Sequence, residues 1–523
     1  MVSSVLSFWC SALVTLAAAD LPADFALSDA PGPNIGQTAT DQKPADDFRS
    51  GEPVITTTYF YWYDIETKAH IVNPDGSDAL TDHPPTMEGF SYKNVQWHAS
   101  ELLDMIQAGI DVVLPVYWGN PAGGFEFSDA GLPPLIEARR QLIARGKNPP
   151  KIGLFYDTST LQHNAGRYHV DLTKEAGRLW FYGTIRNFFS QIPPEHRATI
   201  DGRPLVFLYA SAFAKSVDDR LFPATRDMFR RDFGTDLYLV KMEGWPGQAD
   251  SVYQWGAALR PQLLETAGIG PGYDHSAVPG RTPLVRPRDE GRFYEFSWQR
   301  LLTMDPETRP WLVHLETWNE YHEGSQICET IEYGRQYIEA TRKFTDLFRK
   351  GVRWQPADLQ DGRHAVQATP QSSDGLSIMP QTAGDGPVEE RELAGRMAWK
   401  TVPNKYSPTT RYMYFDVEDY FFFDGDASFD VTIDYLDWGP QGFLIEYDSS
   451  DPQLDGLAQQ FRSGPQQPIS GSGNWQQVTM RIDRARFAGR SNGADFRLTA
   501  LQGNLVVSRV VVRRIAGPSQ DHP

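Results

Sequence analysis

Between residues 51 and 350, short apolar runs alternate with longer amphipathic segments, and this alternation constrains the fold more than any other feature of the chain. Clear strand-like runs begin at Val54, Asp111, Lys151, Pro204, Asp236 and Trp311. Two weaker runs lie in the sequences SVYQWGA and LETAGIGPGY. Eight parallel strands with helices between them, spread over about 300 residues, predict a (β/α)8 TIM barrel for residues 51–350.

A different pattern begins after Gly351. Residues 351–363 are typical of a linker, and from 364 to 516 short alternating strands are separated by Gly, Asp, Asn and Pro turns. This pattern predicts an all-β jelly-roll sandwich. The length of 523 residues is too great for one ordinary hydrophobic core, which agrees with two domains.

The N-terminus has the pattern of a secretory signal peptide. An apolar run from Val5 to Ala19 ends in three alanines and turns polar at Asp20. We predict a signal peptide over residues 1–19 and a secreted protein, because the run is short for a membrane span; a retained anchor is the alternative. Residues 20–50 are rich in Pro, Asp and Ala without periodicity, which predicts a flexible arm.

Charge and cysteine content exclude several classes of function. With 67 acidic and 49 basic residues the net charge is −18, the wrong sign for binding nucleic acid. Cys328 is the only cysteine after residue 19, and we favour a small buried side chain over a nucleophile because no basic partner is evident. No zinc-type cluster or phosphate-binding glycine loop is present, so we expect no metal or other cofactor. We also expect no membrane partner after cleavage, and a monomer.

The stretch HLETWNEYHEGSQICET, residues 314–330, follows the last predicted strand and carries four glutamates among aromatic residues. Glu320 and Glu323 would point to opposite faces of a continuing strand, but they can face one cavity if the chain turns at HEG. Two close carboxyls supply an acid and a base, because like charges raise one pKa, and this is what glycosidic hydrolysis needs. The alternative is a solvated acidic loop, which the interleaved Trp318 and Tyr321 disfavour. The other two glutamates of the stretch, Glu316 and Glu329, are expected in supporting or surface positions.

Polar and aromatic residues also stand where other predicted strands end, at the edge where barrel active sites lie. Rings with a polar tip suit sugar binding, and 12 % of the residues are aromatic; packing inside the barrel is the alternative. Asn319 and His322 are placed to hold hydrogen bonds beside the glutamates. Together with these two, the predicted glycan-binding residues are Tyr61, Tyr63, Asp64, Trp118 and Asp157.

Three further groups are weighed against structural roles. His98 is a candidate ligand contact, but packing is favoured, and Glu243 is a weaker candidate for sugar binding. In the sandwich, an acidic run could hold Ca²⁺, which takes six to eight oxygen ligands, although no EF-hand spacing is present and exposed strand ends are favoured. This run consists of Asp416, Glu418, Asp419, Asp424 and Asp426.

The sequence TWNEYHEGSQICE resembles the signature of glycoside hydrolase family 99, the endo-α-mannosidases and endo-α-mannanases. GIGPGYDHSAVPGRTPLVRPRDEGRFYEFSWQRLL is similar to the stretch that precedes that signature, and YFYWYD, QWHASELLDMIQAGIDVVLPVYWG and KIGLFYD look like the first three strands. The resemblance covers roughly residues 53–345 and is most specific in its last third. It implies that Tyr273 and Arg292 contact substrate.

The resemblance also implies a reaction. An α-linked glycan, mannan-like or N-glycan-like, would be cleaved with retention: Glu320 deprotonates the sugar 2-hydroxyl, which closes onto the anomeric carbon, while Glu323 protonates the leaving group and then activates water. Departures from the signature at Tyr321, Ser325 and Cys328 indicate a related branch, similar to families 99 and 71, and leave the sugar open. Two alternatives are a non-catalytic carbohydrate-binding protein and an inverting α-glucanase-like hydrolase with carboxyls about 6.5–9.5 Å apart. The sandwich is a candidate carbohydrate-binding domain.

Overall fold

The computed structural model describes residues 19–36, 47–281, 284–354, 363–379, 384–404, 406–407 and 409–515. It consists of two compact units, Met1–Gln355 and Pro356–Pro523. The predicted signal peptide lies outside the described residues except for Ala19, as does most of the predicted linker. No helix among the described residues is long and apolar enough to cross a membrane.

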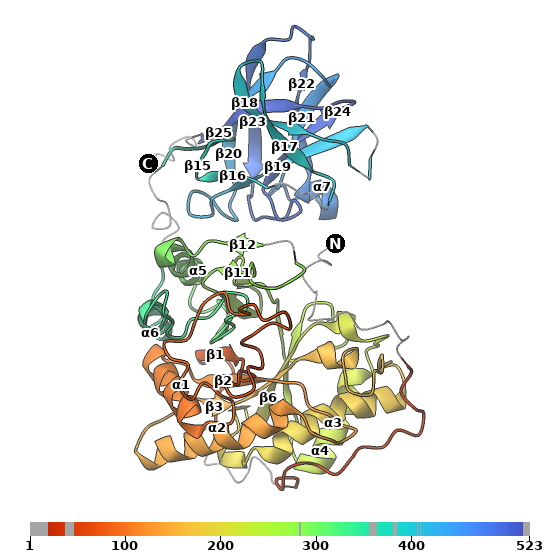
Figure 1. Cartoon of the computed structure of the whole chain (residues 1–523), viewed down its shortest axis with the longest axis vertical. Coiled ribbons are helices and arrows are strands. Elements are labelled where there is room, and N and C mark those ends of the chain that lie inside the picture. The colour runs from red at the N-terminus through yellow and green to blue at the C-terminus, as the bar shows by residue number, and fades with distance from the viewer. Residues whose placement is uncertain are drawn as a thin grey trace. The chain divides into compact units, whose positions relative to one another are not determined.

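The first unit is built on eight parallel strands that follow one another in chain order around a nearly closed sheet (Figure 1). All eight predicted strands are confirmed. They are β1 (Val54–Tyr59), β2 (Val112–Tyr117), β3 and β4 (Lys151–Ile152 and Leu154–Tyr156), β6 (Arg203–Leu208), β7 (Tyr238–Met242), β8 (Ser251–Tyr253), β10 (Thr266–Ile269) and β13 (Leu312–Leu315).

The closure of this sheet has one weak point. The last strand, β13, lies between β1 and β10, and Leu315 is the register partner of both Thr57 and Ile269. Between β8 and β10 the described residues form no backbone ladder, and a side-chain hydrogen bond of 2.7 Å joins Ser251 to Thr266. The sheet is therefore barrel-like and nearly closed, as the strand count predicts.

Six α-helices in the described part of the first unit follow strands, as the alternating pattern predicts, and within the described residues no α-helix follows β7 or β8 directly. They are α1 (Val95–Ala108), α2 (Phe127–Ala144), α3 (Glu175–Gln191), α4 (Leu221–Phe233), α5 (Arg292–Thr303) and α6 (Gln336–Arg349). Their ends follow local chemistry: Asn94 caps α1 by accepting from the Gln96 amide, and Gly109 ends it at a φ of 83°, a conformation that favours glycine.

Shorter elements complete the first unit. Two short antiparallel strands flank the sheet, β5 (Thr199–Ile200) beside β6 and β9 (Gln262–Leu263) beside β10. A small hairpin between β10 and α5 consists of β11 (Tyr273–Asp274) and β12 (Val285–Arg286). This hairpin follows the C-terminal end of β10, so it stands at the edge of the sheet where β13 also ends.

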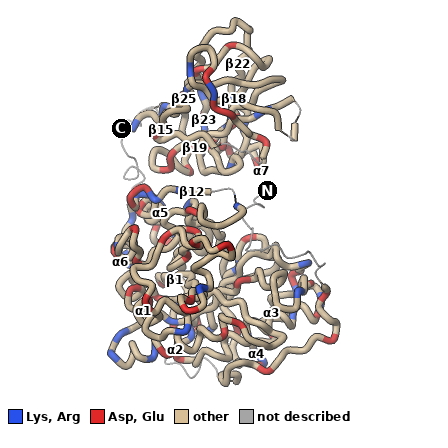
Figure 2. The backbone as a smooth tube through the Cα atoms, viewed as in Figure 1, with Lys and Arg blue, Asp and Glu red and all other residues tan. Residues whose placement is uncertain are grey.

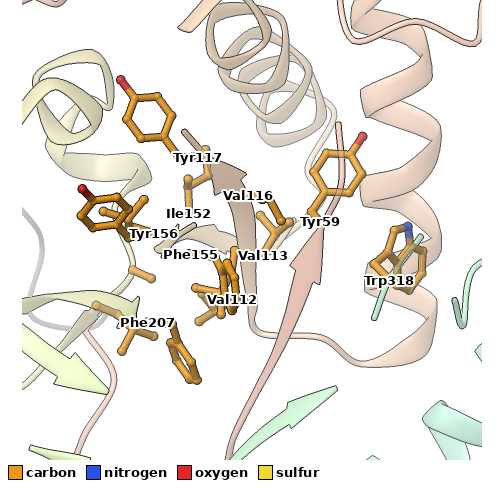
Figure 3. Close-up of a cluster of buried hydrophobic side chains, with 14 of the residues drawn as sticks. Tyr59, Val112, Val113, Val116, Tyr117, Ile152, Phe155, Tyr156, Phe207 and Trp318 are labelled. Carbon is orange, nitrogen blue, oxygen red and sulfur yellow. The ribbon is translucent and has the colours of Figure 1, made fainter. Parts of the chain in front are cut away.

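The interior of the barrel identifies which side chains point inward. His314 of β13 contacts the rings of Phe155, Phe207 and Tyr253, which come from three other strands, and its ring nitrogens lie 3.0 and 2.8 Å from the hydroxyls of Thr56 and Thr58. Burial lowers the pKa of His314 to about 3, so the ring is neutral. Figure 3 shows Phe155 and Phe207 in this core.

The segment predicted to be a flexible arm is attached to the first unit in its described part. Backbone amides of Ser28, Asn34 and Phe48 donate to carbonyls of the barrel's outer segments at 3.1, 2.9 and 3.0 Å. The barrel therefore satisfies part of the polar main chain of residues 20–36 and 47–50, which follow an irregular path.

The second unit is all-β, as predicted, and contains two antiparallel sheets around a separate core. The first sheet holds β14 (Ala365–Thr369), β15 (Ser372–Asp374), β17 (Val388–Leu393), β18 (Arg396–Thr401), β20 (Ala427–Leu436), β23 (Trp475–Ala485) and β25 (Val506–Arg514). The second holds β16 (Leu376–Ile378), β19 (Thr410–Val417), β21 (Gly442–Tyr447), β22 (Arg462–Pro468) and β24 (Phe496–Leu501), and a short helix, α7 (Gly456–Gln460), precedes β22. The jelly-roll connectivity stays a prediction.

Candidate active site

The loop after β13, residues 316–330, makes the turn that its sequence predicts. The Trp318 amide donates to the Thr58 carbonyl at 2.8 Å, which fixes the loop to β1, and the chain then turns at residues 321–324. Gly324 has a φ of 52°, and a Cβ there would lie 3.2 Å from the Asp274 carbonyl oxygen. The turn holds Glu323 close enough to Glu320 that its charge contributes to raising the pKa of Glu320.

Glu320 is 3 % exposed and its two carboxyl oxygens differ. Oε1 accepts from the His322 amide at 3.2 Å and lies 2.7 Å from His322 Nδ1. Oε2 has no hydrogen-bond partner among the described residues. Burial raises the pKa of Glu320, and the neighbouring His322 opposes that shift. One oxygen is thus committed to the protein, and the other is available to a ligand.

His322 controls the proton of Glu320. Its Nε2 lies 2.8 Å from the carbonyl oxygen of His70, which can only accept, so Nε2 carries a hydrogen. The short contact between Nδ1 and Glu320 therefore holds one shared proton, either on an imidazolium beside a carboxylate or on a carboxylic acid beside a neutral ring. Burial is the largest influence on the pKa of His322 and lowers it, but the charge and hydrogen bond of Glu320, the His70 carbonyl and the charge of Glu323 together raise it, and the net shift is upward.

Glu323 has a different environment. Its side chain is 24 % exposed, and Arg281 Nη1 donates to Oε1 at 2.9 Å. Tyr273, at the start of the small hairpin, is buried, and burial followed by the charge of Glu323 raises the pKa of its hydroxyl. The Asp274 amide donates to the Glu323 carbonyl at 2.8 Å. The hairpin therefore positions Glu323, and the predicted Tyr273 lies beside it.

Glu316, the first residue after β13, was expected in a supporting or surface position, and the surface part of that expectation is wrong. It is 1 % exposed, and its Oε2 accepts from the amides of Gly256 and Ala257 at 2.9 and 2.8 Å. Burial raises the pKa of Glu316 to about 8, and the charge of Glu323 adds to that shift. Glu329 pairs with Arg335 at 2.5 Å and is the supporting residue that we expected.

The opposite wall of the mouth comes from other strand ends. Asp157, after β4, accepts from the Trp118 indole at 2.7 Å and from the Ser159 amide at 3.0 Å, and burial raises its pKa. Tyr209 follows β6 and Trp255 follows β8, and their rings meet edge to face at 5.4 Å. The predicted Trp118 and Asp157 are thus held against each other at the barrel mouth, with both aromatic and carboxyl groups present.

Four predicted glycan-binding residues use their polar groups within the protein. The hydroxyls of Tyr61 and Tyr63 donate to carbonyls of Ser128 and Asn319, and Asp64 forms a 2.7 Å ion pair with Lys93. The side-chain amide of Asn319 accepts from the Phe60 amide at 2.7 Å and donates to the Phe60 carbonyl at 2.8 Å. All four are at most 1 % exposed, so they position loops and the prediction that they touch glycan is not supported.

The arginine beside the glutamates is not the predicted one. Arg292 is exposed at the first position of α5, whereas Arg281, in the loop between β11 and β12, contacts Glu323. Sequence reasoning also missed Glu316, Tyr209 and Trp255. The signal for the last two was present, because each follows directly on a predicted strand; Glu316 differs from its neighbours only through contacts made by the distant loop after β8.

Several other candidates have structural roles. His98 is buried between the Tyr59 hydroxyl and the Tyr92 carbonyl, as the packing interpretation predicts. Cys328 is buried, burial raises the pKa of its thiol, and its sulfur lies 3.1 Å from the Tyr321 hydroxyl oxygen, so it is a packed side chain and not a nucleophile.

Three of the five members of the acidic run in the second unit are paired with arginines. Arg363 contacts Glu418, Arg486 lies 2.5 Å from Asp424, and Arg484 lies 3.4 Å from Asp426. Among the described residues, no group of three or more His, Cys, Asp or Glu side chains is arranged to hold a metal ion. Figure 2 shows acidic and basic residues interspersed over each unit.

A sequence match confirms the resemblance to the endo-α-mannosidase family. A segment of 103 residues is 32 % identical to the glycoprotein endo-alpha-1,2-mannosidase of Mus musculus, covering 17 % of this chain and 21 % of that protein. The glycoprotein endo-alpha-1,2-mannosidase-like protein of Homo sapiens gives the same identity and covers 22 % of its length. The chain thus matches about a fifth of the length of these curated relatives.

A solved structure and a family model complete the comparison. The GH99 endo-alpha-mannosidase from Bacteroides thetaiotaomicron is 16 % identical with a TM-score of 0.42, over 57 % of this chain and 98 % of that one. The family model described as "Domain of unknown function (DUF5010)" matches residues 34–356, more than half of the chain, and the chain therefore belongs to this family.

Proposed function

We propose that the chain is a glycoside hydrolase that cleaves an α-linked glycan at the mouth of the barrel. The observation that carries this proposal is the pair Glu320 and Glu323, which lie close together in unlike surroundings. Glu320 is buried with one free oxygen, and Glu323 is partly exposed beside Arg281 and Tyr273. Glycosidic hydrolysis needs two carboxyls with unlike environments, because one gives a proton and the other takes one.

Glu320 is assigned the base. Its free Oε2 takes the proton of the sugar 2-hydroxyl, whose oxygen then bonds to the anomeric carbon as the bond to the leaving oxygen breaks. His322 tunes this carboxyl through the proton shared with Oε1. The His70 carbonyl fixes the imidazole tautomer, so the proton cannot leave through Nε2.

Glu323 is assigned the acid and then the base. It protonates the leaving oxygen in the first step, and in the second it takes a proton from water as the water oxygen bonds to the anomeric carbon. The three-membered ring opens, and its oxygen recovers the 2-hydroxyl proton from Glu320. The sugar is released with retained configuration. The partial exposure of Glu323 supports this role, because the leaving group and the water reach the site from solvent.

The substrate class follows from the relatives. One of them is a glycoprotein endo-alpha-1,2-mannosidase and the other an endo-alpha-1,2-mannosidase-like protein, and we propose a mannan-like or N-glycan-like α-linked substrate for this chain. The rings of Trp118, Tyr209 and Trp255 supply faces on which sugars stack. We further propose a secreted monomer with a complete TIM barrel, and a second unit that is a jelly roll and binds carbohydrate.

The test is a hydrolysis screen with α-mannan and α-glucan oligosaccharides, in which NMR records the first-formed anomer. We expect cleavage with retention. Glu323→Gln should reduce turnover at least about 10³-fold while leaving glycan affinity within about threefold, as expected when an acid is removed but shape is kept. Inversion would overturn the epoxide route and favour an α-glucanase-like mechanism. Binding without turnover in the wild type would indicate a carbohydrate-binding protein.

A further inference from the structure

We infer that Glu316 is a third carboxyl of this mouth, a substrate-binding residue whose Oε1 forms a hydrogen bond with a sugar hydroxyl. The inference rests on the proposed glycosidase function and adds a specificity-determining contact to it. No motif or relative assigns this residue, and its role comes from three observations: where its side chain points, how its two oxygens are used, and what surrounds it.

The first observation is direction. His314 points into the barrel, because rings from β4, β6 and β8 surround it. Glu316 lies two residues later, and its amide still donates to the Ile269 carbonyl of β10 at 2.9 Å. Side chains two residues apart on a strand share a face, so Glu316 also points inward, one layer closer to the mouth. It therefore forms part of the floor on which a ligand at the strand ends would rest.

The second observation is the uneven use of the carboxyl oxygens. The amides of Gly256 and Ala257 donate to Oε2, the nearby Ala258 amide favours the charged carboxylate to a lesser degree, and Oε1 is buried without a hydrogen-bond partner among the described residues. Anchoring the loop after β8 needs only Oε2. A buried oxygen without a partner is destabilising, because it has lost its hydrogen bonds to water without replacement, so a purely structural role does not account for Oε1. A ligand hydroxyl would satisfy it.

The third observation is the chemistry around Glu316. The rings of Phe155 and Trp255 lie 5.5 Å apart, and Tyr209 completes an aromatic wall. Burial raises the pKa of the Tyr209 hydroxyl, and three carboxyl charges add to that shift, those of Glu323, Asp157 and Glu316. Apolar faces next to converging polar groups are what a sugar ring requires. The unpartnered Oε2 of Glu320 belongs to the same loop, so two carboxyl oxygens of this loop are available to sugar hydroxyls.

The hydrogen-bond geometry also indicates the form in which Glu316 binds. Because two amides occupy Oε2, a proton on this carboxyl resides on Oε1, which then donates to the sugar. The titratable groups around it are Glu323, whose Oε1 accepts from Arg281, and the hydroxyls of Tyr209 and Tyr253. Burial raises the pKa of Glu316 to about 8, so the Oε1 donor is present below that pH and is lost above it.

The experiment measures affinity by calorimetry in the non-hydrolysing Glu323→Gln background, with an α-1,2-linked mannotetraose and an α-1,3-linked glucotetraose as probes. Two changes are compared: Glu316→Leu, which removes both oxygens, and Glu316→Gln, which keeps an acceptor for the two amides and a donor in place of Oε1. Glu101→Gln is the matched control, because Glu101 is a partly buried glutamate whose Oε2 accepts from the Trp318 indole at 2.5 Å and is thus used within the protein.

We expect Glu316→Leu to weaken binding of the accepted probe at least about 30-fold at pH 6, and Glu316→Gln to change it less than about threefold. Raising the pH from 6 to 9 should weaken probe binding when Glu316 is present. The affinity of the Glu316→Gln variant should stay the same over this pH range. That difference in pH profile is a readout which loop anchoring would not move, and it decides the case if the Leu variant fails to fold.

Two outcomes would overturn the inference, and they are distinguishable from failure of the proposed function. If the wild type hydrolyses a probe but both Glu316 variants bind like the control, Glu316 is only a loop anchor. The same holds if the Gln variant and its parent have identical pH profiles. If the wild type neither binds nor hydrolyses any probe, the proposed function itself fails and this inference fails with it.

Discussion

The barrel mouth and the acidic run of the second unit both concentrate carboxyl groups, and they use them in opposite ways. In the second unit, the buried Asp495 also accepts two backbone amides, but one goes to each oxygen, from Gly489 at 2.8 Å and from Val417 at 2.9 Å. In Glu316 both amides go to a single oxygen, and the other has no partner among the described residues.

The difference teaches that the number of carboxyls in a sequence says little, and that the state of each oxygen says more. Around Asp424 and Asp426, arginines neutralise the exposed charges, which is how surface acids usually occur. At the mouth, Glu320 and Glu316 each have one buried carboxyl oxygen without a hydrogen-bond partner among the described residues. Such oxygens are destabilising in a protein interior and therefore indicate a ligand.

The largest effect should come from Glu320→Gln. Replacing the proposed base removes the proton acceptor for the 2-hydroxyl, so kcat should fall at least about 10³-fold with little change in affinity. Steady-state kinetics on the substrate found by the screen would measure this.

Glu329→Gln is the control for that change, since Glu329 is in the same stretch but pairs with Arg335. It should change kcat less than about threefold. An equal loss of kcat in both variants would mean that any substitution in this stretch disturbs the site. The contrast between unpartnered and ion-paired carboxyls would then disappear.

The next effect concerns stability. Asn319→Ala removes both hydrogen bonds to the Phe60 main chain, at 2.7 and 2.8 Å, and leaves a buried amide and carbonyl unsatisfied. We expect the free energy of unfolding of the first unit to fall by about 2–4 kcal/mol. Urea denaturation followed by tryptophan fluorescence would measure it. A loss below about 0.5 kcal/mol would contradict the positioning role that we assign in place of glycan contact.

Most of the secondary structure was predictable because it depends on local periodicity. The apolar runs at Val54 and Trp311 and the amphipathic pattern of α1 need no distant partner to be recognised. The turn at Gly324 was predictable for the same reason, since HEG breaks a strand locally. Strand order then brought Trp118 and Asp157 to the edge at which β13 ends, as the barrel geometry requires.

Several predicted glycan-binding residues bond instead to tertiary partners that no local pattern contains. The hydroxyl of Tyr61 donates to the Ser128 carbonyl in α2. The side-chain oxygen of Asn319 accepts from the Phe60 amide in the loop after β1. Position in the motif made them candidates, but long-range bonds consumed their polar groups. Arg281 contacts Glu323 from the loop between β11 and β12. The sequence did not predict this contact, because the path of a loop is not set by periodicity.

A smaller effect is expected from Glu101→Gln. Burial raises the pKa of Glu101 to about 7 from an ordinary 4.5, so the folded state holds a proton that the unfolded state has lost between those values. Stability contributed by this group is therefore lost as pH rises from about 4.5 to 7. The Gln variant should be more stable than the wild type by about 1–3 kcal/mol at pH 8 and nearly equal at pH 4.5, measured by urea denaturation. Equal differences at both pH values would contradict a buried, proton-holding carboxyl.

The smallest effect should come from the acidic run. Asp424 pairs with Arg486, and both side chains are about one-third exposed, so Asp424→Asn should change stability by less than about 1 kcal/mol and leave hydrolysis unchanged. Adding millimolar Ca²⁺ to the wild type should not shift its unfolding temperature, because arginines occupy the positions around these carboxyls that a cation would need. A rise of several degrees in the unfolding temperature with Ca²⁺, abolished by Asp424→Asn, would show that these acids also form a ligand site. The two regions would then differ in the ligand that each binds, a cation in the second unit and a hydroxyl-rich glycan at the barrel mouth.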